Sequence, residues 1–268
     1  MLYFIPTPIG NLEDISLRSL KLLSTCKTVF CEDTRVTKKL INLFEERFSI
    51  STNITQFISL HSHNEQEVLK TIDKTIFDQD VAYLSDAGMP CISDPGCYFV
   101  EYCQKNSIDY EVLPGANALT VAYASSGFCQ KEFLFYGFLP HKGSHRLKQL
   151  EEVMFCGYVS ILYESPHRLI KLIEQICNID ENREIFLIKE LTKMYQKSFK
   201  ASADDVLKQL ENQHIKGEWV VVINSSTKQS GNITIDDIKQ LDIPKKQMAK
   251  MIAKLTGKSP KECYNELL

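Results

Sequence analysis

The sequence predicts an α/β protein with two α/β domains followed by a small helical domain. Three observations support this prediction. Short apolar runs alternate with segments of helical spacing along the first half, the same alternation continues in a different order in the second half, and a lysine-rich tail follows a polar stretch. We expect the domains to span residues 1–128, 129–224 and 233–268, with residues 225–232 as a linker.

The first half contains five short apolar runs, and each is followed by a polar loop and then by apolar residues at helical spacing. The expected strands are Leu2–Ile5, Thr28–Cys31, Phe57–Leu60, Val81–Leu84 and Tyr110–Leu113. The expected helices cover about 15–23, 36–44, 65–77, 97–103 and 118–126. Five such units predict a mostly parallel sheet covered by helices, with all the loops that leave the strands at one edge.

The loop from Ser85 to Gly96 carries two carboxylates, Asp86 and Asp94, among glycines and prolines. Its residues suit turns and helix starts, and we expect Asp94 to be the N-cap and Pro95 the first residue of the next helix. The loop also leaves a buried strand at the edge where α/β sheets bind ligands. Because the other strands deliver their loops to the same edge, we favour a binding site over an ordinary turn.

Composition limits the possible functions. The 268 residues carry 31 basic and 34 acidic side chains, so any nucleic-acid contact needs a local basic patch. The nine cysteines form no C-x-x-C pair and indicate buried thiols in a reducing cytosol. No apolar run approaches the roughly 18 residues of a membrane span, and we expect a cytoplasmic protein without membrane attachment.

Common cofactor and metal motifs are absent. No loop reads G-x-G-x-x-G or G-x-x-x-x-G-K-[ST], which argues against a Rossmann dinucleotide site and a P-loop. His61 and His63 lack a nearby third ligand, so we interpret them as loop residues and expect no metal.

The second half predicts a mixed sheet. The expected strands are 133–138, 159–163, 184–189 and 218–223, and the expected helices run to about 154, to about 176 and over 203–213. After the second of these strands, Glu164, His167 and Arg168 suit either an acid, a base and an anion clamp or the solvated charges of a helix start. Both readings stay open at this point.

The tail predicts two short helices. The first has an apolar face of Ile235, Ile238 and Leu241, and the second has an apolar face of Met248, Met251, Ile252 and Leu255. Six lysines occupy the opposite face of the tail: Lys245, Lys246, Lys250, Lys254, Lys258 and Lys261. Such a face provides solubility or contacts a polyanion, and the pattern alone allows both.

Seven segments together resemble one family. They are PTPIGN at 6–11, CEDTR at 31–35, SDAGMPCISDPG at 85–96, LPGANAL at 113–119, GFLP at 137–140, YESPHR at 163–168 and KELTK at 189–193. With these segments the chain closely resembles, nearly end to end, the ribosomal RNA small subunit methyltransferase I (RsmI) family of the tetrapyrrole methylase superfamily. The resemblance implies a homodimer that binds S-adenosylmethionine in the cleft between its two α/β domains and 2'-O-methylates a cytidine ribose in the decoding region of 16S rRNA, within the small ribosomal subunit.

The same resemblance assigns residues to the site. Those expected at the cofactor are Pro8, Gly10, Asn11, Asp86, Ala87, Gly88, Pro114, Gly115, Ala116, Asn117, Ala118, Tyr163, Glu164, Ser165, Glu190 and Thr192. Those expected at the RNA are Arg35, Lys38, Lys39, Lys142, Arg146, Arg168, Lys245, Lys246 and Lys250. Three positions depart from the family pattern, namely Met89 in place of Thr, Gln196 in place of Glu and Ala201 in place of Gly.

The implied chemistry needs placement more than any single side chain. Methyl transfer to a ribose hydroxyl is an in-line displacement, and positioning supplies on the order of 7 to 11 kcal/mol at best. A general base would add roughly 10² to 10⁴ in rate. The candidates for this base are Glu32, Asp33, Asp86, Glu164 and His167, and the sequence does not choose among them.

Two other functions remain to be distinguished. A tetrapyrrole or diphthine-type methyltransferase would use the same cofactor, although CEDTR, YESPHR and the lysine-rich tail favour the RNA branch. A ribosome-binding factor without catalysis would explain the basic patches alone.

Overall fold

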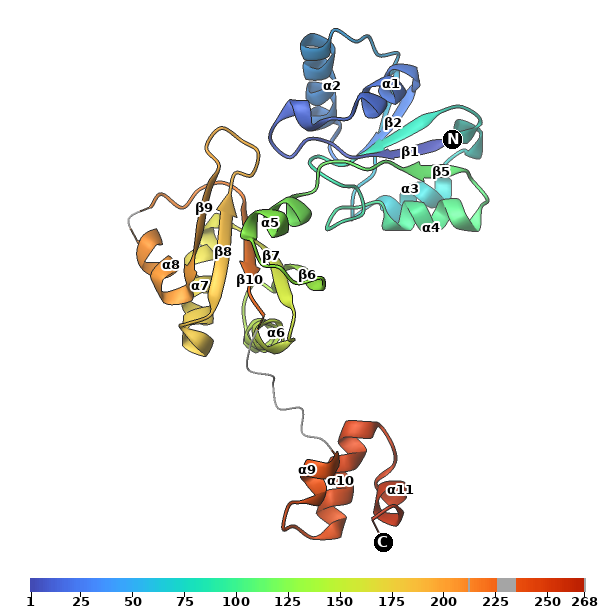
Figure 1. Cartoon of the computed structure of the whole chain (residues 1–268). Helices are drawn as coiled ribbons and strands as arrows, with labels where there is room; N and C mark the ends of the chain where they lie inside the picture. Colours follow the sequence, from blue (N-terminus) through green and yellow to red (C-terminus); the bar gives the residue numbers. More distant parts are fainter. Residues whose placement is uncertain (212, 226–234, 268) are drawn as a thin grey trace. The chain divides into compact units, whose positions relative to one another are not determined.

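The computed structural model describes residues 1–211, 213–225 and 235–267. One compact unit holds two five-stranded sheets, built from residues 1–154 and 158–225. The helices from Ile235 onward belong to a second unit (Figure 1). Within the described residues, no helix is long and apolar enough to cross a membrane.

The first sheet is entirely parallel, as the sequence predicts. Its strands are β1 (Leu2–Ile5), β2 (Thr28–Cys31), β3 (Gln56–Ser59), β4 (Val81–Leu84) and β5 (Tyr110–Val112), in the order β3-β2-β4-β1-β5. Every residue of β2 and β4 is buried, because helices cover both faces of the sheet. The expected strands agree with the observed ones to within one residue at each end.

Four helices cover this sheet, two on each face (Figure 1). Helices α1 (Leu17–Thr25) and α2 (Thr34–Phe48) pack through Leu20, Leu23, Ile41 and Phe44 on one face. Helices α3 (Glu65–Thr71) and α4 (Cys97–Lys105) pack on the other. The expected helix over 65–77 is too long: α3 ends at Thr71, and Asp73 caps a separate 3₁₀ turn over Lys74–Asp78.

The start of α4 corrects the prediction for Asp94 and Pro95. The helix begins at Cys97, and its N-cap is Gly96, whose φ of 122° favours glycine. The cap is supplied by Glu65, whose carboxylate accepts the N–H groups of Gly96 at 3.1 Å and of Phe99 at 3.0 Å. Asp94 therefore has no capping role, and its carboxylate is left for another use.

The second sheet is mixed, as expected, but has one strand more than the sequence predicts. Its strands are β6 (Phe133–Phe138), β7 (Val159–Glu164), β8 (Glu184–Lys189), β9 (Lys197–Ser202) and β10 (Trp219–Ile223), in the order β6-β7-β10-β8-β9. Only β6 and β7 pair in parallel; the other pairs are antiparallel. The unexpected strand β9 lies at the edge of the sheet, where Phe199 is its one buried side chain.

Helices cover both faces of this sheet as well. Helices α6 (Ser144–Phe155), α7 (Pro166–Asp180) and α8 (Ala203–Leu210) pack on one face. Helix α5 (Ala118–Ser126) packs on the other face through Leu119 and Ala122, against Val220 and Val222 of β10. The domain prediction placed α5 with the first sheet, whereas its side chains contribute to the core of the second.

The described residues of the C-terminal unit, 235–267, form three helices where the sequence predicts two. They are α9 (Ile235–Lys239), α10 (Lys245–Thr256) and α11 (Pro260–Asn265), and Ser259 and Glu262 form a capping box at the start of α11. Ile238, Met248, Ile252 and Cys263 form its core. The expected linker lies outside the described residues except for Ser225.

Candidate active site

The loops that leave β1 and β4 are bound to each other at the carboxyl edge of the first sheet. The backbones of Thr7 and Gly88 exchange two N–H···O bonds, each 3.0 Å long. The buried Thr7 hydroxyl donates to the carbonyl of Ser85 and accepts the N–H of Gly88, both at 3.1 Å. Gly88 itself has a φ of 93°, and a Cβ there would lie 3.2 Å from Ile9 Cγ2. This edge is therefore fixed before any ligand binds.

A cavity of about 470 Å³ opens between these loops and the second sheet. From the first half it is lined by Ile9, Glu32, Asp86, Ala87, Gly88, Met89, Ile92, Ser93, Asp94, Asn117 and Ala118. From the second half it is lined by Phe138, Tyr163, Glu164, Ser165, Pro166, Leu191, Gly217, Glu218, Trp219 and Val220. Its volume lies within the range of pockets that bind cofactors and other small molecules.

Three carboxylates of the first sheet line this cavity: Glu32, Asp86 and Asp94. Asp86 accepts the backbone N–H of Asp33 at 3.1 Å, and Glu32 accepts the backbone N–H of Asp86. Burial raises the pKa of both, and for Glu32 the charge of Asp86 adds to the effect. Burial, together with the charges of Glu32 and Asp86, raises the pKa of Asp94 to about 7.

The opposite wall combines aromatic rings with the end of β7. Tyr163 packs edge to face against Phe135 and Phe138, with ring centroids 5.0 and 5.7 Å apart. Burial raises the pKa of Tyr163 to about 12, so its hydroxyl stays protonated at neutral pH. Phe138 is exposed at the cavity and offers a ring for stacking.

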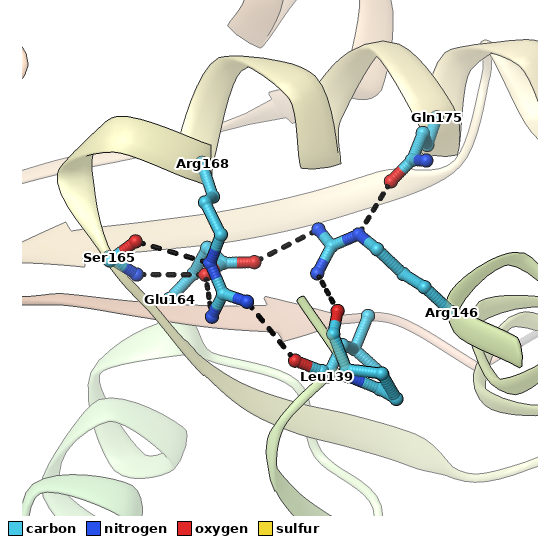
Figure 2. Close-up of polar contacts among 7 residues, drawn as sticks. Leu139, Arg146, Glu164, Ser165, Arg168 and Gln175 are labelled. Atoms are coloured by element: carbon cyan, nitrogen blue, oxygen red, sulfur yellow. Dashed lines mark hydrogen bonds and ion pairs between the residues drawn. The ribbon is translucent and has the colours of Figure 1, made fainter. Parts of the chain in front are cut away.

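Behind this wall lies a buried network of three charged side chains, Arg146, Glu164 and Arg168 (Figure 2). Glu164 binds Arg146 Nη2 at 3.0 Å and Arg168 Nη2 at 2.6 Å, and it accepts the N–H of Ser165 at 2.9 Å. Arg146 also donates to the carbonyl of Pro140 and to Gln175 Oε1, at 3.1 and 3.0 Å. Arg168 donates to the Leu139 carbonyl and the Ser165 hydroxyl. The network joins β7, α6, α7 and the loop after β6.

This network corrects two sequence-based assignments. Arg146 was expected at the RNA, but its side chain is only 2% exposed and all three of its guanidinium nitrogens have protein partners. Glu164 was a candidate base, but the guanidinium groups of Arg146 and Arg168 and the N–H of Ser165 already occupy its carboxylate oxygens. Glu164 lines the cavity, and Arg146 and the mostly buried Arg168 hold it from behind.

Two other candidates for the general base, Asp33 and His167, are also unsuited to that role. Asp33 caps α2 by accepting the N–H of Arg35, and it forms an ion pair with the Arg35 side chain at 2.7 Å. These hydrogen bonds hold its pKa below the usual range, which makes it a poor base. His167 is exposed on α7 and is not among the residues that line the cavity.

The residues expected at the cofactor divide into two groups. Asp86, Ala87, Gly88, Asn117, Ala118, Tyr163, Glu164 and Ser165 line the cavity. Pro8, Gly10, Asn11, Pro114, Gly115, Ala116, Glu190 and Thr192 do not, and several of them hold loops together.

Contacts between loops explain why three residues of the second group, Gly10, Asn11 and Gly115, lie outside the cavity. Gly10 lies against the turn between β8 and β9, where a Cβ would come within 2.5 Å of Lys193 Cγ, and Asn11 donates its N–H to the Thr192 hydroxyl at 3.2 Å. Gly115 lies against Pro6, where a Cβ would come within 2.6 Å of the proline ring. These glycines permit close approach between segments rather than contact with a ligand.

Sequence reasoning missed several residues of the cavity: Ile9, Met89, Ile92, Ser93, Asp94, Phe138, Pro166, Leu191, Gly217, Glu218, Trp219 and Val220. Asp94 is the most informative of them. Its position eight residues after Asp86 in one loop was visible in the sequence, but the expected capping role concealed it. Met89, one of the three departures from the family pattern, also lines the cavity, whereas Gln196 accepts the N–H of Thr192 within the β8–β9 turn.

The other basic residues expected at the RNA are exposed. Arg35, Lys38, Lys39 and Lys142 belong to the first unit, and Lys245, Lys246 and Lys250 lie along α10. Lys38 lies over the ring of Phe57, with Nζ 5.1 Å from the centroid.

Comparison with known proteins gives a consistent set of relatives. The family model for tetrapyrrole (corrin/porphyrin) methylases matches residues 1–207. The ribosomal RNA small subunit methyltransferase I of Campylobacter fetus subsp. fetus (strain 82-40) is 50% identical over 270 residues, covering 100% of both chains. The protein of that name from Helicobacter pylori (strain J99) is 42% identical over 281 residues, covering 100% of this chain and 97% of its own. That from Bacillus subtilis (strain 168) is 36% identical, covering 90% and 79%.

Solved structures share the fold at low sequence identity. The native form of uroporphyrin III C-methyltransferase from Thermus thermophilus has a TM-score of 0.56 at 13% identity, covering 83% of this chain and 96% of that chain. A structure of uroporphyrin-III C-methyltransferase from the same organism in complex with S-adenosyl homocysteine has a TM-score of 0.54 at 12% identity, covering 82% and 96%.

Proposed function

Because the chain belongs to the ribosomal RNA small subunit methyltransferase I family of the tetrapyrrole methylases, we propose that it 2'-O-methylates a cytidine ribose in the decoding region of 16S rRNA. The chain is a methyltransferase, and S-adenosylmethionine is its methyl donor. The observation that carries the proposal is the full-length match to rRNA methyltransferases, combined with a cavity at the ligand-binding edge of a parallel sheet.

The residues of the cavity fit this methyl donor. The carboxylates of Asp86, after β4, and Glu32, after β2, offer acceptors for the ribose hydroxyls of the donor and a counter-charge for its ammonium group. Asp86, Ala87, Gly88, Asn117 and Ala118 would hold the donor from one side, and Tyr163 and Ser165 from the other. When bound, the donor supplies a methyl group activated by a positively charged sulfur.

The chain contributes mainly by placing the reactants. The paired loops at Thr7 and Gly88 and the charged network behind Ser165 fix both walls of the cavity through buried bonds. Rigid walls let two reactants meet without further ordering, and such placement provides much of the rate of a displacement reaction. The apolar side chains of Ile9, Ile92, Leu191 and Val220 limit the water in the cavity.

The partner follows from the same proposal. Arg35, Lys38, Lys39 and Lys142, with the α10 lysines, offer exposed positive charge for phosphate contacts. We expect the substrate to lie within the small ribosomal subunit, and therefore the enzyme to be cytoplasmic. From the family we also expect it to act as a homodimer.

The test is a methyl-transfer assay with labelled S-adenosylmethionine. Three acceptors are compared: undermodified small subunits, naked 16S rRNA and a tetrapyrrole. We expect label in the RNA of at least one of the first two, and 2'-O-methylcytidine after nuclease digestion and mass spectrometry. Label only on the tetrapyrrole, or on a base rather than a ribose, would contradict the proposal, and binding to subunits without transfer would indicate a factor without catalysis.

A further inference from the structure

The loop between β4 and α4 holds Asp94 in a way that no turn or cap requires. Cys91, Ser93 and Gly96 all have positive φ, at 69°, 64° and 122°. For the two residues with side chains this backbone is strained, and such strain persists where the surrounding structure enforces it. The Glu65 carboxylate binds the N–H groups of Gly96 and Phe99, and the Cys91 N–H binds the Pro95 carbonyl at 3.2 Å. Asp94 is thus fixed from both sides along the chain.

Of the three cavity carboxylates that come from the first sheet, Glu32, Asp86 and Asp94, only Asp94 lacks a protein partner among the described residues. Glu32 and Asp86 each accept a backbone N–H, so part of their hydrogen-bonding capacity is used in holding the loops. In the described part of the chain, the Asp94 carboxylate makes no hydrogen bond and no ion pair. A polar group that is partly buried in a cavity without a partner is available to a ligand.

We propose that Asp94 is the general base that accepts the proton of the target ribose 2'-hydroxyl. The inference rests on the proposed function. In the step, the 2'-oxygen forms a bond to the methyl carbon while the carbon–sulfur bond breaks and its electron pair stays on the sulfur. The hydroxyl proton passes to a carboxylate oxygen of Asp94, which later releases it to solvent. No metal or further reactant is needed.

The electrostatic surroundings suit this role. Glu32 and Asp86 face Asp94 from the ends of β2 and β4, and the hydroxyls of Tyr83 and Tyr163 and the thiol of Cys91 are the other titratable groups that respond to its charge. Burial, together with the charges of Glu32 and Asp86, raises the pKa of Asp94 to about 7, where a general base is most effective at neutral pH. The positive charge of the bound donor will lower this pKa and keep the carboxylate ionised when the hydroxyl arrives.

The main experiment measures single-turnover methyl transfer at saturating donor and RNA for the wild type and Asp94→Asn. We expect the variant to bind the donor normally but to react 10² to 10⁴ times more slowly. The wild-type rate should rise tenfold per pH unit below its apparent pKa and then level off, and the variant should lose this dependence. Asp109→Asn makes the same chemical change at an exposed carboxylate and should leave rate and profile unchanged.

A second measurement uses the protein without donor or RNA. Carboxyl-carbon NMR should show one aspartate that titrates near pH 7 in the wild type, and this signal should be missing in Asp94→Asn. Asp94→Asn with an unchanged rate and pH profile would overturn the assignment while leaving the proposed function intact. A loss of donor affinity with an unchanged saturated rate would overturn it as well. Absence of transfer by the wild type on any RNA would instead refute the proposed function.

Discussion

Replacing Glu164 by Gln should destabilise the chain more than replacing its partner Arg168 by Gln. The side chains of Glu164 and Arg146 are 0% and 2% exposed, and that of Arg168 is 17% exposed. The three together carry one net positive charge. Glu164→Gln raises this to two positive charges without a counter-ion, in a site that solvent hardly reaches.

The loss of stability in Glu164→Gln depends on which hydrogen bonds of Arg146 remain. Removing one member of a buried ion pair costs about 3 to 5 kcal/mol, and the Gln carbonyl together with the Pro140 and Gln175 acceptors keeps part of the bonding around Arg146. We therefore expect the low end, about 3 kcal/mol. For a chain of this size that loss lowers the melting temperature by roughly 6 to 12 °C.

Two matched variants test the charge argument. Arg168→Gln leaves the neutral Arg146–Glu164 pair but removes the Arg168–Glu164 ion pair and the bonds to Leu139 and Ser165, and it should cost about 1.5 to 2 kcal/mol because Arg168 is the most exposed member of the network. Adding Arg146→Met to Glu164→Gln removes the more deeply buried of the two uncompensated charges and should restore part of the loss. Melting is followed by circular dichroism. If Glu164→Gln costs no more than Arg168→Gln, or if the double variant is the least stable, the reasoning is refuted.

Three further predictions concern the cavity and the tail. Asp86→Asn should fold normally but weaken S-adenosylmethionine binding by roughly 1.5 to 3 kcal/mol in calorimetry on RNA-free protein, because a charge-assisted bond is lost; unchanged affinity would reduce Asp86 to a turn residue. Changing Lys245, Lys246 and Lys250 to Ala should flatten the salt dependence of RNA binding by a slope of roughly 0.7 to 0.9 per phosphate contact, and an unaltered slope would leave these lysines to solubility. Asp94→Asn should raise the free energy of unfolding by roughly 2 kcal/mol above pH 7, a figure that allows for solvent screening of a partly exposed group. In the wild type the raised pKa of Asp94 means that the folded protein loses stability as the pH rises from about 4 through 7, and the Asn variant avoids this loss. Melts at pH 4 and pH 8 check this, since no gain should remain at pH 4.

The sequence was most informative where a single local pattern decides the structure. Val81–Leu84 and Thr28–Cys31 are continuous apolar runs in the middle of a covered sheet, and their bounds were predicted correctly. Lys197–Ser202 was missed because an edge strand buries little, and its alternating polar residues resemble a loop. Local pattern measures burial, so it detected the more apolar edge strands β3, β5 and β6 but overlooked the polar edge strand β9.

The site was harder to predict because its chemistry depends on partners far away in the chain. Asp94 looked like a helix cap, but the cap comes from Glu65, about thirty residues earlier. Arg146 looked like a surface charge because its neighbours are polar, but Glu164 draws it into the core of the second sheet. Long-range pairs of this kind leave no periodic signal, and they decided which carboxylate remains available.

The order of the strands along the chain bears on how the protein is made. All five strands of the first sheet come from the first 112 residues, and all five strands of the second come from 133 onward. The first sheet can therefore be completed while the ribosome is still synthesising the second, since domains generally fold as units from the N-terminus. The core that covers helix α5 draws on β7 and β8 and is completed only when β10 emerges about a hundred residues later. During that interval the apolar face of α5, with Leu119 and Ala122, is not yet fully covered by its native partners.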